Sequence, residues 1–246
     1  MALHPSVAAW QRVTDHLMHD LFGGPKAIRL SWVINLQKGG TLPFVLALMF
    51  AFDNFSTTAW TYLVLHGSYG LCWLLKDVVF PDESWQQKVT VGGALTTAAG
   101  LIGYWIAPVV VVVGRVEQPA WLLAAAGVVY VLGVVVMMTA DAQKHYVLKA
   151  RRGLITDGMF ARVRHPNYLG EMLLYGAFAV VAGHFAPWIV LAVIWLGLFV
   201  PNMLRKEARM ARYPEWAAYV ARSGFLLPRV TRARAPVDKT AVVAEA

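Results

Sequence analysis

The residues between 164 and 171 combine side chains that can bind a cofactor within an otherwise apolar region. The run reads Arg164-His165-Pro166-Asn167-Tyr168-Leu169-Gly170-Glu171. Pro166 suits the first turn of a helix, so Tyr168, Glu171 and Tyr175 would share one face. A carboxylate one turn inside an apolar helix is costly unless it is paired or faces a polar cavity. We interpret Glu171 as an acid of a cofactor pocket; the alternative is an interfacial carboxylate paired with an arginine.

A second group of polar residues precedes this run. Asp141, Gln143 and Lys144 stand at the end of a long apolar stretch. The planar fork of Arg matches phosphate oxygens well, and Lys supplies a compact positive charge. The candidates to bind phosphate are Lys144, Lys149, Arg151, Arg152 and Arg164. The alternative is that these charges only mark the cytoplasmic ends of the neighbouring helices.

The composition predicts what kind of element must position these residues. The chain has 246 residues, of which 58% are hydrophobic and 15% charged, with a mean hydropathy of +0.53. Ordinary soluble domains are roughly 45–50% apolar and about 25% charged. This excludes a disordered chain and disfavours a soluble enzyme. We expect an all-α fold, a polytopic bundle of membrane helices in contact with membrane lipids.

Polar interruptions divide the apolar stretches into about six transmembrane helices. The predicted spans are residues 41–52, 57–75, 89–113 and 120–140, with two more in residues 168–204 that separate at 183–187. Pro108 is expected to kink the third span. Lys76 and Asp77 are interpreted as an interfacial pair. Residues 231–246 would form a loose tail.

Charge patterning predicts the orientation of the bundle. The net charge is +8, and basic residues concentrate in 144–165 and 205–234. By the positive-inside rule these segments, both termini and the cofactor pocket would be cytoplasmic. We expect no cleaved secretory signal, since the start of the chain lacks a basic segment followed by a long apolar one. The single cysteine excludes an internal disulfide, and neither a metal site nor a nucleic-acid-binding module is expected.

The 164–171 run resembles the signature of a superfamily of polytopic membrane enzymes. Its members include steroid 5-alpha-reductases, C14/C7 sterol reductases, and isoprenylcysteine carboxyl methyltransferases with phospholipid N-methyltransferases. Residues 207–228 resemble the closing motif of this superfamily, and residues 139–145 are similar to its bacterial 5-alpha-reductase-like branch. The resemblance implies a cytoplasmic cofactor pocket beside a lipid-facing substrate tunnel. Residues 1–140 would then form the lipid-substrate side and residues 141–230 the cofactor-binding part. The residues that it adds to the pocket are Asp141, His165, Asn167, Tyr168, Glu171, Arg205, Glu207 and Tyr219.

The N-terminal half carries a second resemblance, to the substrate site of the steroid 5-alpha-reductases. Ser31 to Lys38 is similar to a stretch in which Gln and Glu meet the enone of the substrate, with Lys38 in place of that Glu. Leu65-His66-Gly67 is similar to a Leu-His-Tyr of that site, with Gly67 in place of Tyr. The resulting candidates to donate a hydrogen bond to a substrate carbonyl are Gln37, Lys38, His66 and Tyr69.

Three functions follow from these residues. The first is an NADPH-dependent reductase of a hydrophobic, steroid- or isoprenoid-like conjugated substrate, acting on a C=C bond. The second is an S-adenosylmethionine-dependent methyltransferase of a lipid or isoprenylcysteine-like substrate, in which Arg205 and Glu207 help to bind substrate or cofactor. The third is a non-catalytic membrane protein that binds sterol or lipid. The sequence favours the first.

Overall fold

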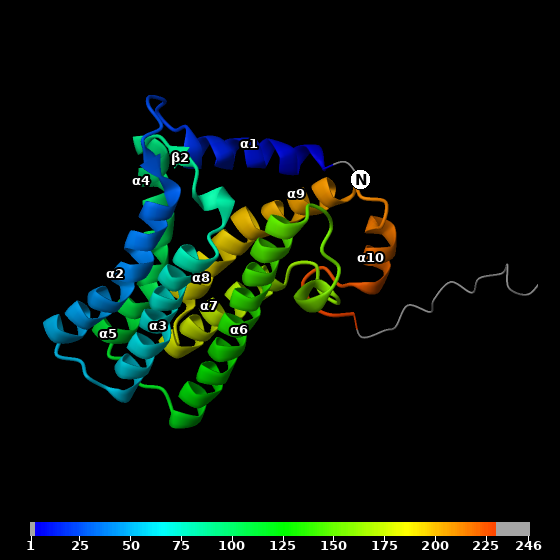
Figure 1. Ribbon diagram of the computed structural model, residues 1–246. Helices are drawn as coiled ribbons and strands as arrows, with labels where there is room; N and C mark the ends of the chain where they lie inside the picture. The colour runs from blue at the N-terminus through cyan, green and yellow to red at the C-terminus, as the bar shows by residue number, and fades with distance from the viewer. Residues whose placement is uncertain (1–2, 230–246) are drawn as a thin grey trace, which may run out of the picture.

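The computed structural model describes residues 3–229, so the predicted loose tail at 231–246 lies outside the described residues. The described chain is mainly helical (Figure 1). Its helices in the first half are α1 (Pro5–His19), α2 (Leu30–Ala51), α3 (Thr57–Val79), η1 (Glu83–Trp85), α4 (Val91–Ile102), η2 (Gly103–Trp105) and α5 (Ile106–Val113). Those in the second half are α6 (Ala120–Ala150), η3 (Gly158–Phe160), α7 (Pro166–Ala182), α8 (Phe185–Ile194), η4 (Trp195–Phe199), α9 (Val200–Met210) and α10 (Trp216–Arg222).

Four helical stretches are long and apolar enough to cross a membrane. They are Leu30–Ala51, Val91–Val113, Ala120–Ala150 and Phe185–Met210. Their outer faces carry large exposed apolar side chains, such as Leu36 at 78%, Trp121 at 70% and Leu196 at 71% exposure. A soluble protein rarely exposes so much apolar surface, whereas lipid accepts it. The chain is therefore a helical membrane protein.

The all-α expectation needs one small correction. Strands β1 (Ile28–Arg29) and β2 (Lys88–Val89) form a short antiparallel pair, with Ile28 opposite Val89. This pair ties the start of α2 to the start of α4. Two-residue strands leave no periodic signal in a sequence, so their pairing depends on tertiary contacts.

Helix α2 begins well before the predicted start at residue 41. Lys38, Gly39 and Gly40 interrupt the apolar pattern, yet all three are helical. A Cβ on Gly39 would lie 3.1 Å from Leu74 Cδ1, so this glycine lets α2 pack tightly against α3. Tertiary packing thus outweighs the low helix propensity of glycine.

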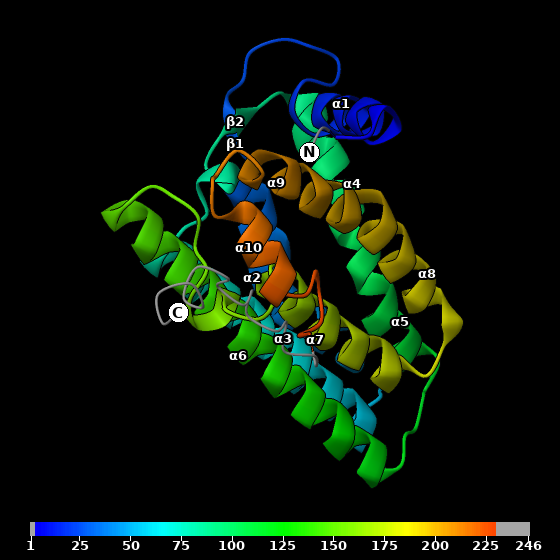
Figure 2. The ribbon, with the colours of Figure 1, turned by 90° about the vertical axis from the view of Figure 1, so that its right-hand side faces the viewer.

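Prolines account for the breaks in two long helices. Pro108 has no N–H for the carbonyl of Tyr104, and the 3₁₀ turn η2 separates α4 from α5 at that point. Pro201 likewise leaves the carbonyl of Gly197 without its helical partner, and η4, a π-helical turn, lies there. Figure 2 shows the bent course of the chain from α8 into α9.

Helix α1 lies across one end of the bundle and binds at the second break (Figure 1). Trp10 Nε1 donates a hydrogen bond of 2.6 Å to the carbonyl of Gly197, the group that Pro201 cannot satisfy. Gln11 Nε2 donates one of 2.5 Å to the carbonyl of Pro201. An ion pair of 2.8 Å between Arg205 and Asp15 extends the contact. Helix α1 therefore holds the broken helix in one geometry.

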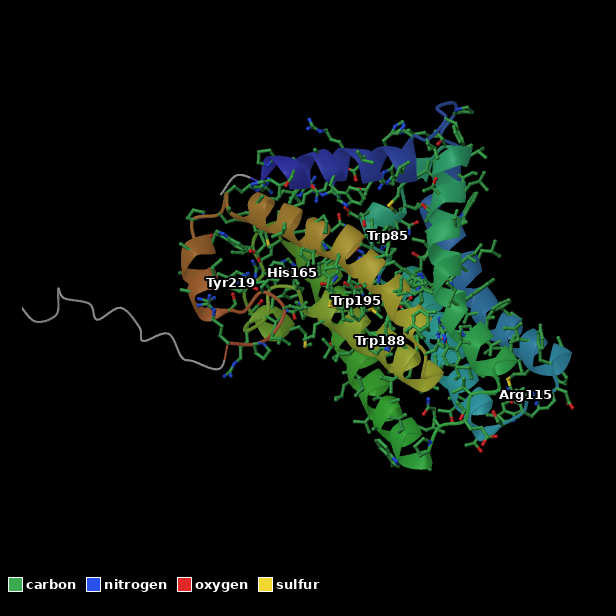
Figure 3. All side chains as sticks on the ribbon, turned by 180° about the vertical axis from the view of Figure 1, so that it is seen from behind. Trp85, Arg115, His165, Trp188, Trp195 and Tyr219 are labelled. Atoms are coloured by element: carbon green, nitrogen blue, oxygen red, sulfur yellow. The ribbon has the colours of Figure 1, made fainter. Side chains whose placement is uncertain are left out.

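The loops gather at two opposite ends of the bundle. At one end, Arg115 donates hydrogen bonds to the carbonyls of Phe52 and Asp53, and Asn54 donates one to the carbonyl of Val112. At the other end lie His165 and Tyr219, far from Arg115 (Figure 3). This second end contains the polar residues that the sequence singles out.

Candidate functional site

A cavity of about 850 Å³ opens at the end of the bundle that holds His165 and Tyr219. Its walls come from the ends of α3, α6 and α9, the loops before η1 and α7, and α10. Pockets for drug-sized ligands usually measure about 300–1,000 Å³, so this one can hold a large cofactor. Thus elements from both halves of the chain form one site.

The cavity is strongly basic. Eight of its lining residues are Lys or Arg and three are acidic. The basic ones are Lys76, Lys144, Lys149, Arg152, Arg164, Lys206, Arg209 and Arg212; the acidic ones are Asp82, Glu83 and Asp141. A low-dielectric recess with one excess sign of charge concentrates ligands of the opposite sign. The cavity therefore suits an anionic ligand.

Two ion pairs cross the cavity wall between α6 and the end of α3. Lys76 Nζ lies 3.2 Å from Asp141 Oδ2, and Lys144 Nζ lies 2.6 Å from Asp82 Oδ2. Burial would raise the pKa of Asp82, but the charge and hydrogen bond of Lys144, together with hydrogen bonds from Ser84, hold it well below its ordinary value. Asp82 thus remains a carboxylate at neutral pH. The pairs fix α3 against α6 and leave Asp141 Oδ1 buried without a partner among residues 3–229.

Buried hydrogen bonds hold the closing motif, residues 207–228, against the 164–171 run. Arg164 Nε donates a hydrogen bond of 2.5 Å to Glu207 Oε1, and Arg164 Nη1 donates one of 2.7 Å to the carbonyl of Ser223. His165 Nε2 lies 3.3 Å from the same Glu207 oxygen. Burial lowers the pKa of His165, and the hydrogen bond with Glu207 offsets this only in part, so a neutral imidazole is favoured.

Helix α10 closes this side of the cavity. The Tyr219 hydroxyl donates a hydrogen bond of 2.7 Å to the carbonyl of Phe160, and burial raises the pKa of Tyr219 to about 12. Tyr219 is therefore a neutral hydrogen-bond donor at neutral pH. An isolated bridge pairs Val163 with Gly224 and ties the two motifs together through the backbone.

The predicted cofactor residues fall into two groups. Those that line the cavity are Asp141, Lys144, Arg152, Arg164, His165, Asn167 and Tyr219. Those that do not are Arg151, Tyr168, Glu171, Arg205 and Glu207. Arg151 is exposed beside the cavity, Arg205 pairs with Asp15 on α1, and Glu207 pairs with Arg164. Tyr168 accepts a hydrogen bond of 3.2 Å from Lys206, which does line the cavity.

The sequence interpretation missed several cavity residues, Lys76 among them. Lys76 and Asp77 do not form the expected pair, because neighbouring helical residues point in different directions. Lys76 pairs with Asp141, whereas Asp77 accepts hydrogen bonds from Asn35 at 2.7 Å and Gln86 at 2.8 Å. Lys206, Arg209 and Arg212 were also missed. Lys206 and Arg209 are three residues apart in the basic segment after residue 204. In a helix this spacing places both on one face, and it was the signal that could have identified them.

A second polar cluster lies deeper in the bundle, around Lys38. Its Nζ donates a hydrogen bond to the Tyr175 hydroxyl and lies 4.8 Å from the centroid of the Tyr69 ring. His66 is 6.3 Å, centroid to centroid, from Tyr175 and accepts or donates a hydrogen bond of 2.9 Å with Tyr62. Three of the predicted substrate-site residues, Lys38, His66 and Tyr69, are thus brought together around Tyr175.

Gln37 is the fourth predicted residue of that site. Its side chain is buried, at 5% exposure, and neither its Oε1 nor its Nε2 has a partner among the described residues. A buried amide without hydrogen bonds is costly and uncommon in proteins. Gln37 therefore keeps its hydrogen-bonding capacity available.

Helix α7 links the cavity to the buried cluster. Asn167 lines the cavity, and Tyr175 accepts the hydrogen bond of Lys38 two turns further along. Glu171 lies between them, half-buried, on the face that also carries Tyr168 and Tyr175. A ligand in the cavity and a ligand at the cluster would therefore approach each other near Glu171.

Among residues 3–229, no group of three or more His, Cys, Asp or Glu side chains is arranged to hold a metal ion.

Residues 85–223 match a protein family of unknown function, DUF1295. The chain belongs to this family. DUF1295 is a steroid 5-alpha-reductase-like group, which supports the broad superfamily indicated by the 164–171 run. The matched region contains the cavity residues from Asp141 to Tyr219, whereas Lys38, His66 and Tyr69 lie before it.

One curated relative is an uncharacterised protein of Schizosaccharomyces pombe. It is 30% identical over 95 residues, which cover 35% of this chain and 27% of the relative. The chain thus matches just over a quarter of the length of that protein.

Proposed function

We propose that this member of DUF1295 is an integral membrane reductase that binds NADPH in the basic cavity and reduces a C=C bond of a hydrophobic conjugated substrate. The basic lining of the cavity carries this proposal. NADPH bears a pyrophosphate and a 2′-phosphate, and each phosphate gains from charge-assisted hydrogen bonds with Arg and Lys. S-adenosylmethionine bears no phosphate and has a positive sulfonium, which the same lining would repel.

The residues fit NADPH in two respects. Arg152, Arg209 and Lys149 line the cavity without an acidic partner within 4.0 Å among residues 3–229, so their charges are available to phosphates. Asp141 Oδ1 is a buried acceptor without a donor, and a ribose hydroxyl or a carboxamide can supply one. Asn167 offers both a donor and an acceptor nearby.

The chain's own residues would orient the reaction. When bound, NADPH supplies the hydride; the protein supplies position, a dry surrounding and hydrogen bonds. The cavity cations would hold the phosphate end, while Asn167 and Glu171 would direct the other end along α7 toward Tyr175. The aromatic cluster excludes water from the substrate, which strengthens every electrostatic interaction there.

We further propose that six segments span the membrane. Helices α3 and α7 run within the bundle alongside the four long apolar stretches (Figure 2). They carry few charges, and the buried cluster between them requires surroundings without water. By the positive-inside rule, the end of the bundle with the basic cavity, and with it helices α1 and α10, would face the cytoplasm, where NADPH is available.

A pair of adjacent arginines provides a test of the cavity assignment. Both side chains are exposed, but only Arg152 lines the cavity, so charge reversal at each should differ in effect. We expect Arg152→Glu to weaken NADPH binding by about ten- to a hundredfold, the loss of one or two charge-assisted contacts. Arg151→Glu should weaken it less, because Arg151 does not line the cavity and its charge is screened over about 8 Å at physiological salt.

The measurement is NADPH titration of the detergent-extracted protein by tryptophan or nicotinamide fluorescence. Equal and small effects of the two substitutions would contradict binding of the phosphates in this cavity.

A further inference from the structure

The pairing of β1 with β2 places two cations side by side. Arg29 lies opposite Lys88, and Ile28 lies opposite Val89. Val89 is buried, whereas Arg29 and Lys88 are both exposed. Directly opposite residues of an antiparallel pair extend from the same face, with Cβ atoms about 5 Å apart. The two positive side chains therefore share the outer face of the strand pair.

This arrangement is unfavourable for the protein alone, because like charges directly opposite each other in a sheet repel. Neither Arg29 nor Lys88 has an acidic partner within 4.0 Å among residues 3–229. Lys26, only three residues before Arg29, does have one, since its Nζ lies 2.5 Å from Asp20 Oδ1. The packing of the strand pair therefore gives no reason for two cations at these positions.

The pair of cations lies where two apolar helices begin. Strand β1 leads directly into α2, and β2 leads into α4 after one residue; both helices belong to stretches long enough to cross a membrane. Both strands lie at the end of the bundle that α1 crosses (Figure 2). The large apolar side chains exposed on the first two turns of the helices are Trp32, Leu36, Val91 and Leu95. Because lipid accepts this surface, Arg29 and Lys88 stand at the level of the lipid headgroups.

Two exposed aromatic side chains belong to the same corner of the molecule. The guanidinium carbon of Arg29 lies 5.9 Å from the centroid of the Trp32 ring, within cation–π range. Tryptophan is typical of the level where a membrane meets water. Phe22 is 87% exposed, and a Cβ on Gly92 would lie 2.9 Å from its Cδ2, so its ring adjoins the first turn of α4.

The backbone holds Phe22 in this exposed position. Its φ is 63°, in the left-handed region that bulky residues rarely adopt. Thr90 fixes the preceding residues, because its Oγ1 donates a hydrogen bond of 2.9 Å to the carbonyl of Leu21 and its N–H donates one of 3.1 Å to the carbonyl of His19. An exposed ring on strained backbone is unfavourable in water, whereas contact with lipid chains would stabilise it.

We propose that Arg29 and Lys88 bind the headgroup phosphate of an anionic phospholipid, whose chains lie against Trp32, Phe22 and the start of α4. A phosphate between the two cations replaces their repulsion by two attractive contacts. Each contact gains charge-assisted hydrogen bonds, and the planar fork of Arg29 can bind two phosphate oxygens at once. The lipid would thus hold the strand pair, and with it the starts of α2 and α4, in place.

The charge of the site selects among lipids. A zwitterionic headgroup such as phosphocholine carries a positive group that the two cations repel, whereas an anionic headgroup has none. In the proposed orientation the site faces the cytoplasmic leaflet, whose anionic lipids attract basic residues beside membrane helices. Arg29, Lys88, Trp32 and Phe22 do not line the basic cavity, so this site is separate from the one proposed for NADPH.

The experiment follows the melting temperature of the delipidated protein in an uncharged detergent, without NADPH, as phosphatidylglycerol is added. Phosphatidylcholine and glycerol 3-phosphate are the comparison ligands. We expect phosphatidylglycerol to raise the melting temperature most, because it combines a negative headgroup with acyl chains. Phosphatidylcholine should raise it less, and glycerol 3-phosphate, which has no chains, should leave it unchanged at the same concentrations.

Variants at the strand pair should change this response in a characteristic way. Lys88→Gln should require about fivefold more phosphatidylglycerol for the same rise, since one basic residue near an anionic lipid surface contributes about this factor. Without lipid, the same variant should melt at or slightly above the wild type, because the repulsion with Arg29 is gone. The double variant Arg29→Gln/Lys88→Gln should lose most of the response.

Lys26→Gln is the matched control, because it removes an exposed lysine of the same corner that already pairs with Asp20. It should respond to phosphatidylglycerol nearly like the wild type. An equal loss in Lys26→Gln and Lys88→Gln would mean that only the overall positive charge attracts the lipid, and would overturn the proposal. An unchanged response in the double variant would overturn it as well, as would equal stabilisation by phosphatidylcholine or by glycerol 3-phosphate.

Discussion

Asn167 and Glu171 stand where the cavity meets the interior of the bundle. Asn167 lines the cavity, and Glu171 follows one turn later on α7. Within residues 3–229, neither side chain makes a hydrogen bond or an ion pair. Arg164, in contrast, binds Glu207 and Ser223. The two residues are therefore available to a ligand, while Arg164 holds the fold.

Substitution of these two residues should affect NADPH and leave folding nearly unchanged. Glu171→Gln should reduce NADPH affinity by about ten- to a hundredfold, since a charge-assisted hydrogen bond contributes about 1.5–3 kcal/mol. Asn167→Ala should reduce it by about two- to tenfold, since a neutral hydrogen bond contributes about 0.5–1.5 kcal/mol. The melting temperature without NADPH should match the wild type. Arg164→Ala is the contrasting variant and should lower it, because it leaves Glu207 buried without its partner. Wild-type affinity in both Asn167→Ala and Glu171→Gln would contradict the site.

Some residues of the site could be predicted from the sequence, and others could not. The types and spacing of residues 164–171 identified cavity residues because they lie together in the chain. The ion pair of Lys76 with Asp141 joins two helices through a distance of 3.2 Å and leaves no local pattern. Such pairs depend on the register between helices, which the sequence does not display.

Helices α6 and α7 cross at two glycines, and this crossing positions the 164–171 run. A Cβ on Gly170 would lie 2.5 Å from the Met137 backbone nitrogen, and one on Gly133 would lie 2.7 Å from the Leu174 backbone nitrogen. Small residues allow membrane helices to approach closely. Gly170 belongs to the same run as Asn167 and Glu171, so one segment supplies both the packing and the ligands.

Enlarging Gly170 should separate the two helices. Gly170→Ala places a methyl group against backbone atoms that cannot move aside, and overpacking typically costs about 1–3 kcal/mol. We expect a lower melting temperature and weaker NADPH binding. Gly176→Ala on the same helix meets only Trp188 Cη2 at 3.9 Å and is the matched control, with stability at or above the wild type. Equal stability of the two variants would contradict the close crossing.

At the scale of elements, apolar stretches predicted most helices but not their ends. Asn35, Gln37 and Lys38 interrupt the first turns of α2, and α6 continues to Ala150 through polar sequence, so hydropathy did not mark these ends. These segments carry Lys38 of the buried cluster and Asp141 and Lys144 of the cavity. The helix ends that were hardest to predict therefore contribute residues to both sites.

The charged residues that line the cavity lie together at one end of the bundle. The loop containing Arg115 lies at the opposite end of the bundle from His165 (Figure 3). If the basic end is cytoplasmic, single cysteines introduced at Ala150 and Glu117 in a Cys72→Ser background should differ in access. A membrane-impermeant thiol reagent on the cytoplasmic side should label Ala150→Cys and not Glu117→Cys. Labelling of Glu117→Cys from that side would contradict the proposed orientation.

The most direct test of the central claim is which cofactor stabilises the protein, and how salt changes the effect. A ligand that binds only the folded state raises its stability by about 2.7 kcal/mol at a hundredfold excess over Kd. Melting of the detergent-extracted protein should therefore rise with NADPH, and the rise should shrink as salt screens the cavity charges. S-adenosylhomocysteine should have little effect. A salt-insensitive rise with S-adenosylhomocysteine, and none with NADPH, would contradict the reductase assignment and favour a membrane methyltransferase.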